Sequence, residues 1–147
     1  KMNNEKQINP VPQGKYVPAT RSGSLIFTAG MTPRKNGVLI FSGKVNSSEP
    51  VEIYEEAVVQ ATSNALAAAR NILMEGEHID KILSLTVYVN ADEKFTNHSK
   101  IADFASRFLF DEIGKKRIGS RTAVGVFSLP GNAPVEVQMI LRISCLP

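Results

Sequence analysis

Two segments near the C-terminal end of the chain constrain its fold most strongly. Residues 121–129 and 135–143 carry apolar side chains at almost every odd position, whereas their even positions are mixed. A repeat of two is typical of β-strands, because successive side chains of a strand point to opposite faces of a sheet. Residues 129–134, which read Leu-Pro-Gly-Asn-Ala-Pro, supply the proline, glycine and asparagine that turns favour. The pattern predicts two strands joined by a turn, each with one face on a core.

Two charged residues interrupt these strands. Arg121 opens the first strand and Glu136 lies near the start of the second. An arginine can hold a planar carboxylate through its forked donors, and a glutamate that stays ionised in a pocket can act as a general base or orient a water. Each also has an ordinary explanation, because Arg121 could continue the basic segment 115–117 into solvent and Glu136 could be a strand charge that discourages aggregation. Taken alone, neither residue identifies a site.

The rest of the chain predicts an α+β domain. We expect an extended N-terminal arm over residues 1–15 and a single domain over 16–147. Apolar residues recur at helical spacing between 51 and 76 and between 96 and 113, and Gly114 is a natural stop for the second helix. Asn36-Gly37 is a hairpin signal. The expected strands lie at 16–20, 25–30, 38–41, 82–90, 121–129 and 135–143.

This order predicts one sheet with both helices on the same face. The other face, which includes Tyr88, Val124 and Ile140, is too apolar for free exposure and too polar for a dry core, so we expect it to pack against other copies of the chain. In a simple hairpin, Glu136 would lie roughly 24 Å along the strand from Arg121. Either another strand lies between them and changes the offset, or a neighbouring subunit completes the site.

Length and composition bound the class of protein. The 147 residues fit one domain, and the net charge of +3 is too small and dispersed to predict nucleic acid or an anionic membrane as the main partner. No window approaches the ~20 apolar residues of a membrane span, and the N-terminal residues lack the apolar core of a signal peptide. Cys145 is the single cysteine, which is typical of a reducing compartment, so we expect a cytoplasmic protein.

Few other residues offer site chemistry. Tyr16 could project a phenol into a pocket, and Thr28-Ala29-Gly30 ends a predicted strand with small residues that let the backbone approach a ligand. His78 and His98 have no partners at metal-ligand spacing, so we expect no metal. The sequence contains no phosphate-binding glycine loop and no nucleophile elbow.

Several separated segments together resemble the YjgF/RidA family. They are 14–16, 25–33, 82–89, 121–130 and 135–137, and they follow one another in register over nearly the whole chain from Tyr16. The resemblance implies a chorismate-mutase-like α+β fold, with a mixed sheet and two helices on one face. It also implies a homotrimer with a central barrel and ligand pockets between subunits, working without a cofactor.

The resemblance also implies roles for particular residues. Arg121 would grip the carboxylate of a small 2-imino or 2-enamino acid, and Glu136 would position the water that hydrolyses the imine to a 2-oxo acid and ammonia. The substrate-binding residues would be Tyr16, Thr28, Ala29, Gly30 and Ala123.

The chain departs from the family pattern at several pocket positions. Ala29 stands where deaminase members usually carry serine, and Ala123 stands where they often carry cysteine. Asn97 and Ser99 are both candidates for the asparagine expected near the start of the second helix. The loss of two polar side chains should alter substrate choice more than it alters the carboxylate clamp.

Three functions therefore remain open. The first is an imine or enamine hydrolase, a deaminase-type enzyme. The second is an endoribonuclease, for which the basic segment 115–117 could bind phosphates although neither histidine forms a motif for proton transfer. The third is a non-catalytic trimer that binds a small carboxylate-bearing metabolite, since fold alone does not separate binding from catalysis.

Overall fold

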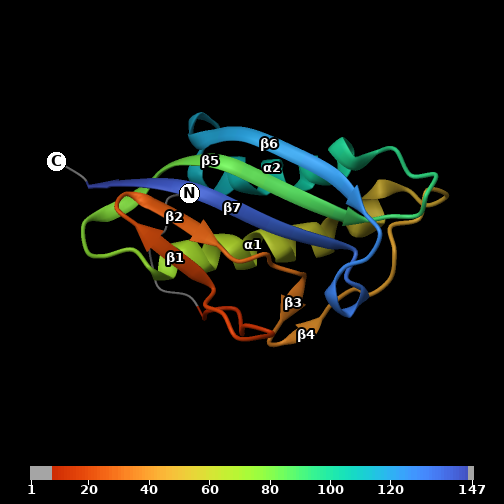
Figure 1. Ribbon diagram of the computed structural model, residues 1–147. Coiled ribbons are helices and arrows are strands. Elements are labelled where there is room, and N and C mark those ends of the chain that lie inside the picture. The colour runs from red at the N-terminus through yellow and green to blue at the C-terminus, as the bar shows by residue number, and fades with distance from the viewer. Residues whose placement is uncertain (1–7, 146–147) are drawn as a thin grey trace.

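The computed structural model describes residues 8–145 as a five-stranded mixed sheet with two helices on one of its faces (Figure 1). Residues 1–7 of the expected N-terminal arm lie outside the described residues, as do 146 and 147. The sheet has the order β1-β2-β7-β5-β6. Its strands are β1 (Ala19–Ser22), β2 (Leu25–Thr28), β5 (Glu77–Asn90), β6 (Ile118–Val126) and β7 (Val135–Cys145).

The remaining elements agree with the expected order. A small hairpin of β3 (Arg34–Lys35) and β4 (Val38–Leu39) turns at Asn36 and Gly37, whose φ angles of 55° and 82° match the predicted hairpin signal. A 3₁₀ turn, η1 (Val51–Tyr54), leads into α1 (Glu55–Asn71), and α2 (His98–Ile113) ends before Gly114. Short 3₁₀ turns η2 (Lys115–Arg117) and η3 (Pro130–Asn132) flank β6.

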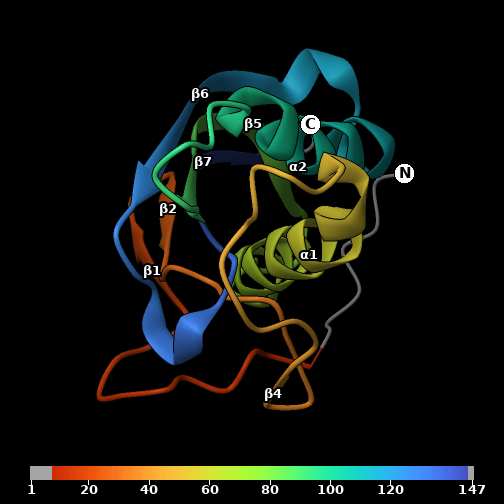
Figure 2. The same cartoon turned by 90° about the vertical axis from the view of Figure 1, so that its right-hand side faces the viewer.

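Both helices cover the same face of the sheet, as the periodicity predicts (Figure 2). The alanines of α1 carry this packing, because their small side chains let the helix approach the strands closely; those that are at most 2% exposed are Ala57, Ala61, Ala65, Ala68 and Ala69. The opposing strand residues Val135, Val137, Met139 and Leu141 are fully buried. The core therefore lies between the helices and the odd-numbered face of β7.

The last two strands do not form a simple hairpin; of the arrangements that the sequence left open, the one with another strand between them is found. β5 lies between β6 and β7, parallel to β6 and antiparallel to β7. The connection from β6 to β7 instead crosses the end of β5, where the side-chain amide of Asn90 donates to Asn132 Oδ1 at 3.1 Å and to the Ala133 carbonyl at 2.9 Å. The turn residues at 129–134 were read correctly as a turn, but the strand that inserts beside them comes from earlier in the chain.

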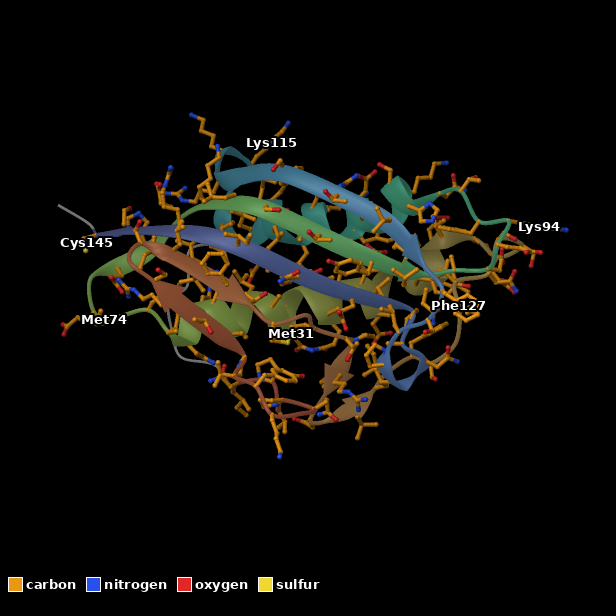
Figure 3. All side chains as sticks on the ribbon, in the orientation of Figure 1. Met31, Met74, Lys94, Lys115, Phe127 and Cys145 are labelled. Carbon is orange, nitrogen blue, oxygen red and sulfur yellow. The ribbon has the colours of Figure 1, made fainter. Side chains whose placement is uncertain are left out.

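Several element boundaries also differ from the sequence-based prediction. β6 ends at Val126, so Phe127 (Figure 3) does not belong to the buried face and is 92% exposed. The first strand begins at Ala19 rather than residue 16, and α1 ends at Asn71, five residues before Gly76. Strand ends depend on which neighbours supply hydrogen bonds, which local periodicity does not encode.

The second face of the sheet has no covering layer among residues 8–145 and faces the viewer in Figure 1. Aligned rows cross it, with Thr122, Thr86 and Gln138 in one row and Val124, Tyr88 and Glu136 in the next. Val124 is 38% exposed and Phe27 is 37% exposed. We call this surface the open face; its packing against other copies stays a prediction. Within residues 8–145, neither helix is long and apolar enough to cross a membrane.

Candidate functional site

Arg121 is anchored to one face of α2. It lies on β6 beside Leu85 of β5, and Leu85 is buried against the helices, so Arg121 shares the helix-covered face of the sheet. Its Nη1 donates to Asp103 Oδ1 at 2.8 Å and to Ser106 Oγ at 3.0 Å, and its Nη2 donates to Ser99 Oγ at 2.8 Å. The side chain keeps 22% of its surface exposed. The guanidinium is therefore held in one orientation while part of it stays open to a ligand.

The surroundings of Arg121 favour a small anion. No side chain caps the first turn of α2, which begins one residue before Ser99, and free N–H groups at a helix start attract negative charge. Ala123, two residues along β6, offers only a methyl group on the same face. Asp103 is the opposing influence, because its carboxylate is 56% exposed and already pairs with the guanidinium. An incoming carboxylate must share Arg121 with Asp103 or displace it.

Glu136 lies in a different environment. It is on β7 beside Tyr88, on the open face of the sheet, and is half-buried. Its carboxylate has no hydrogen-bond partner within the described part of the chain, and burial raises the pKa of this carboxyl above its ordinary value. A buried carboxylate without donors is costly to keep charged, so Glu136 is prepared to accept a proton.

Gly30 lies directly against the Glu136 carboxylate. A Cβ at residue 30 would lie 2.5 Å from Oε2, so only glycine allows the side chain to lie where it does. The neighbouring backbone is fixed by Met31, which exchanges two 2.8 Å hydrogen bonds with Val137 of β7. The sequence predicts that a ligand can approach the backbone closely at Gly30. In this chain the Glu136 side chain lies there.

One chain does not bring Arg121 and Glu136 together. β5 lies between their strands, as one of the two sequence-based alternatives anticipated, and the rows that contain them are three residues apart on β5, at Leu85 and Tyr88. This offset corresponds to roughly 10 Å along the strands and about 10 Å across two strand spacings. The two side chains also point to opposite faces. A small ligand cannot touch both within a single chain.

The other predicted binding residues fall into separate places. Tyr16 is 47% exposed, and its hydroxyl accepts the Gln13 backbone N–H at 3.0 Å. Thr28 is 3% exposed, and its hydroxyl accepts the Met139 N–H at 3.0 Å, which places it inside the sheet rather than on a pocket wall. Ala29 is partly buried and packs against the core.

A cavity of about 240 Å³ lies between the segment that follows the N-terminus, the β3–β4 hairpin and α1. Tyr16 and Gly30 contribute to its walls, together with Arg34 and Gln60. Neither Arg121 nor Glu136 lines it. The hollow within one chain and the two charged residues are therefore different features, and the site proposed below does not rest on this cavity.

Sequence reasoning missed most of the Arg121 environment. Ser99, Asp103 and Ser106 are spaced four and three residues apart, which places all three on one face of α2. That spacing of small polar residues was a readable signal. The structure also separates the two candidates for the helix-start position, since Ser99 contacts Arg121 whereas no contact joins Asn97 to Arg121 among residues 8–145.

The histidines do not form a metal site. His78 lies in β5, 8% exposed, with Nε2 3.1 Å from Ser144 Oγ. His98 begins α2. Residues 8–145 contain no group of three histidine, cysteine or carboxylate side chains placed to hold a metal ion.

Comparison with known proteins adds to this geometry. The family model described as Endoribonuclease L-PSP matches residues 6–143, nearly the full chain. The chain belongs to this family. The sequence-based resemblance to the YjgF/RidA family is thereby confirmed, and the YjgF gene product of Escherichia coli shares the fold with a TM-score of 0.63 at 21% identity.

Proteins from several other organisms resemble the chain over most of their length. Protein TCP17 of Trypanosoma cruzi is 26% identical over 90% of this chain and 84% of that protein, and a RutC family protein of Aquifex aeolicus is 29% identical over 89% and 90%. The solved structure of Atu1372 from Agrobacterium tumefaciens, a protein of unknown function, has a TM-score of 0.79 at 30% identity and covers 91% of this chain and 86% of that one. A Shewanella oneidensis protein, named as a candidate endoribonuclease, reaches 0.82 at 26% identity over 94% and 91%.

Proposed function

We propose that this member of the endoribonuclease L-PSP family hydrolyses small 2-imino or 2-enamino acids to 2-oxo acids and ammonia in a pocket formed between copies of the chain. One observation carries the proposal. Arg121 and Glu136 lie on opposite faces of one sheet, each with chemistry suited to half of the reaction. A second copy of the chain is required to bring an anion clamp and a general base to one ligand.

The proposed assembly is a homotrimer whose open faces form a central barrel. The open face supports this, because Phe27 and Val124 leave apolar surface without cover in a single chain. In a cyclic assembly every copy contributes the same two surfaces, so each pocket takes Arg121 from one copy and Glu136 from its neighbour. Tyr16 and Gly30 lie on the Glu136 side, whereas Ser99 and Ala123 lie on the Arg121 side.

The chemical steps follow from these roles. Arg121 binds the substrate carboxylate and fixes the imine carbon. Glu136 of the neighbouring copy takes a proton from a water as the water oxygen bonds to that carbon, and the C=N electron pair moves to nitrogen, which gains a proton. The carbinolamine then loses ammonia as the C–N bond breaks and the remaining O–H gives up its proton to form the 2-oxo acid. Only protons and water are exchanged.

Burial of Glu136 supports the base role, because a raised pKa makes the carboxylate a stronger proton acceptor than an exposed glutamate. The same raised pKa predicts an acid limb in the pH–rate profile, where protonation of Glu136 stops turnover. Asp103 and Ser106 accept from Nη1 of Arg121 and Ser99 accepts from Nη2, so a ligand carboxylate must share these donors or displace their partners.

The test is a coupled assay with freshly generated 2-imino acids, read as ammonia and 2-oxo acid. We expect the wild type to accelerate hydrolysis and Arg121→Ala to lose roughly 10²–10³-fold in kcat/KM, the size of a charge-assisted contact made to the reacting ligand. Arg107→Ala is the matched control, since Arg107 also lies on the α2 side but is 62% exposed and only 3.7 Å from Glu55. Equal loss in both variants, or none in either, would exclude the clamp.

Ligand binding without turnover is the second candidate, and one observation favours it. Arg121 donates hydrogen bonds to Ser99, Asp103 and Ser106, which hold the guanidinium in one orientation. This orientation suits the binding of a carboxylate whether or not a reaction follows. A measurable affinity for 2-oxo acids without ammonia release would select this function. RNA cleavage, suggested by the names of relatives, requires cleavage that persists through repurification and fails in Arg121→Ala.

A further inference from the structure

His98 lies over the same face of β6 as Arg121, above Gly125. It is the first residue of α2, and the ring packs edge-on against Phe95 at 5.1 Å between centroids. The next residue, Ser99, accepts a hydrogen bond from Arg121. His98 and Arg121 are therefore linked through adjacent residues of one helix turn, and both lie over the same face of the same strand.

Gly125 is what allows this position of the imidazole. A Cβ at residue 125 would lie 2.7 Å from His98 Nε2 and 3.4 Å from Cδ2, so any side chain there would push the ring away. Gly125 is four residues along β6 from Arg121, and Ala123 between them adds only a methyl group on that face. On this face the strand therefore carries only small residues between Arg121 and the imidazole.

The imidazole has no hydrogen-bond partner. Neither ring nitrogen of His98 is bonded by any residue between 8 and 145, and the side chain is partly exposed. His78 differs in this respect, because its Nε2 contacts Ser144 Oγ. An imidazole nitrogen without a partner in these residues is available to hydrogen-bond a ligand. Charged groups on the segments that pack against His98 are Arg121 on β6, Lys100 and Asp103 in the first turns of α2, and Asp92, Glu93 and Lys94 in the preceding loop.

We propose that His98 is a catalytic residue of this site, the general acid that protonates the nitrogen leaving group. The proposal rests on the proposed imine hydrolysis and adds a proton donor on the Arg121 side of the ligand, so that the proton taken up by Glu136 of the neighbouring copy need not cross to the leaving nitrogen. His98 enters the pocket from the same copy as Arg121, opposite the neighbouring Glu136.

The proton balance is complete with this residue. The imidazolium Nε2–H passes its proton to the amino nitrogen of the carbinolamine as the C–N bond breaks, and ammonia leaves. The carbinol O–H gives its proton to solvent as the carbonyl forms, and the neutral imidazole regains a proton from water. No oxidant or further reactant is consumed.

Kinetics test this role against simple packing on Phe95. We expect His98→Gln, which keeps polarity and approximate size, to lower kcat by about 100-fold with KM nearly unchanged, the effect typical of a lost general acid. We also expect the alkaline limb of the kcat–pH profile to disappear in the variant and free imidazole to restore part of the rate. His78→Gln is the matched control and should leave kcat and the profile unchanged.

A second readout does not depend on turnover. In ¹⁵N spectra of the histidine side chains, pyruvate should shift the His98 Nε2 resonance of the wild type and leave that of His78 in place. Unchanged kcat and profile in His98→Gln, with no shift of the His98 resonance, would overturn the proposal while Arg121→Ala still loses activity. If the wild type releases no ammonia, the imine hydrolysis fails and the acid role with it, and a pyruvate-induced shift would then mark His98 as a ligand contact alone.

Discussion

Two arginine–glutamate combinations in this protein differ in whether their side chains meet within one chain. Arg21 and Glu77 meet within one chain, where Nη1 reaches Oε1 at 2.7 Å and Nη2 reaches Oε2 at 2.6 Å. Arg121 and Glu136 lie on different strands and opposite faces and do not meet. The first pair joins β1 to the start of β5, whereas the second leaves an arginine tied to a helix and a carboxylate without donors.

The pKa values of the two glutamates record this difference. Hydrogen bonds from Arg21, and then from the Met74 N–H, lower the pKa of Glu77 to about 2. Burial raises the pKa of Glu136. A carboxylate that stabilises the fold is held in its charged form, and one that is available for proton transfer is not. The comparison separates an ion pair within the fold from two residues of opposite charge that do not pair with each other in one chain.

Mixing two inactive variants tests the separation with the largest expected effect. In the proposed homotrimer, Arg121→Ala and Glu136→Gln, co-expressed with different tags and purified on both, would form mixed trimers in which about one pocket in three keeps both residues. We expect turnover near a third of the wild-type value from parents that are each nearly inactive. The control is Arg121→Ala mixed with the double variant, which restores no intact pocket. Mixed trimers no more active than their parents would place both residues of a site in one chain.

Arg21→Ala should lower the stability of the protein and leave its activity nearly unchanged. It removes a bidentate partner from a nearly buried carboxylate, so we expect the Tm to fall by several degrees while kcat/KM stays within about twofold. Differential scanning calorimetry with the coupled assay checks both. Arg107→Ala, which breaks a 3.7 Å exposed pair, should change the Tm by no more than about one degree. A loss of activity without a loss of stability in Arg21→Ala would contradict the structural role.

The pH dependence of stability should follow Glu77. Its pKa is lowered from about 4.3 in an unfolded chain to about 2 in the folded one, so the folded state binds fewer protons between these values. The stabilisation is therefore complete above about pH 5 and is lost as pH falls towards 2. We expect the difference in Tm between wild type and Glu77→Gln to shrink over that window. A difference that stays constant from pH 6 to pH 2.5 would argue against this ion pair.

Glu136→Gln should give the smallest change in Tm, and this change should be an increase rather than a decrease. Because the folded-state pKa is raised, the charged carboxylate costs stability above that pKa and costs nothing once protonated. We expect the variant to be as stable as the wild type or more stable by one to a few degrees near pH 7, with the gain absent at low pH. Glu52→Gln on η1, at an exposed position, is the reference and should show no such pH dependence. A loss of Tm at pH 7 would mean that Glu136 has a stabilising partner.

The sequence was sufficient for some features and insufficient for others, for physical reasons. Helices and strands were located because burial on one face leaves a period of 3.6 or 2, and Asn36-Gly37 marked a hairpin through its backbone preference. The order of β6 and β7 stayed open, because a turn of six residues fits a hairpin or a crossing over β5 equally well. Arg121 and Glu136 were selectable as charges inside strands, but the serines and aspartate around Arg121 form a site only after α2 packs on β6.

The position of β7 has a consequence for how the molecule is made. This last strand is in the middle of the sheet, where it pairs with β2 on one side and β5 on the other. During synthesis the early hairpin and the later parallel pair are therefore two separate pieces with exposed edges, and nothing in the sheet joins them until β7 has left the ribosome. Until β7 has formed, the edges of β2 and β5 that it joins stay unpaired, and unpaired strand edges favour aggregation.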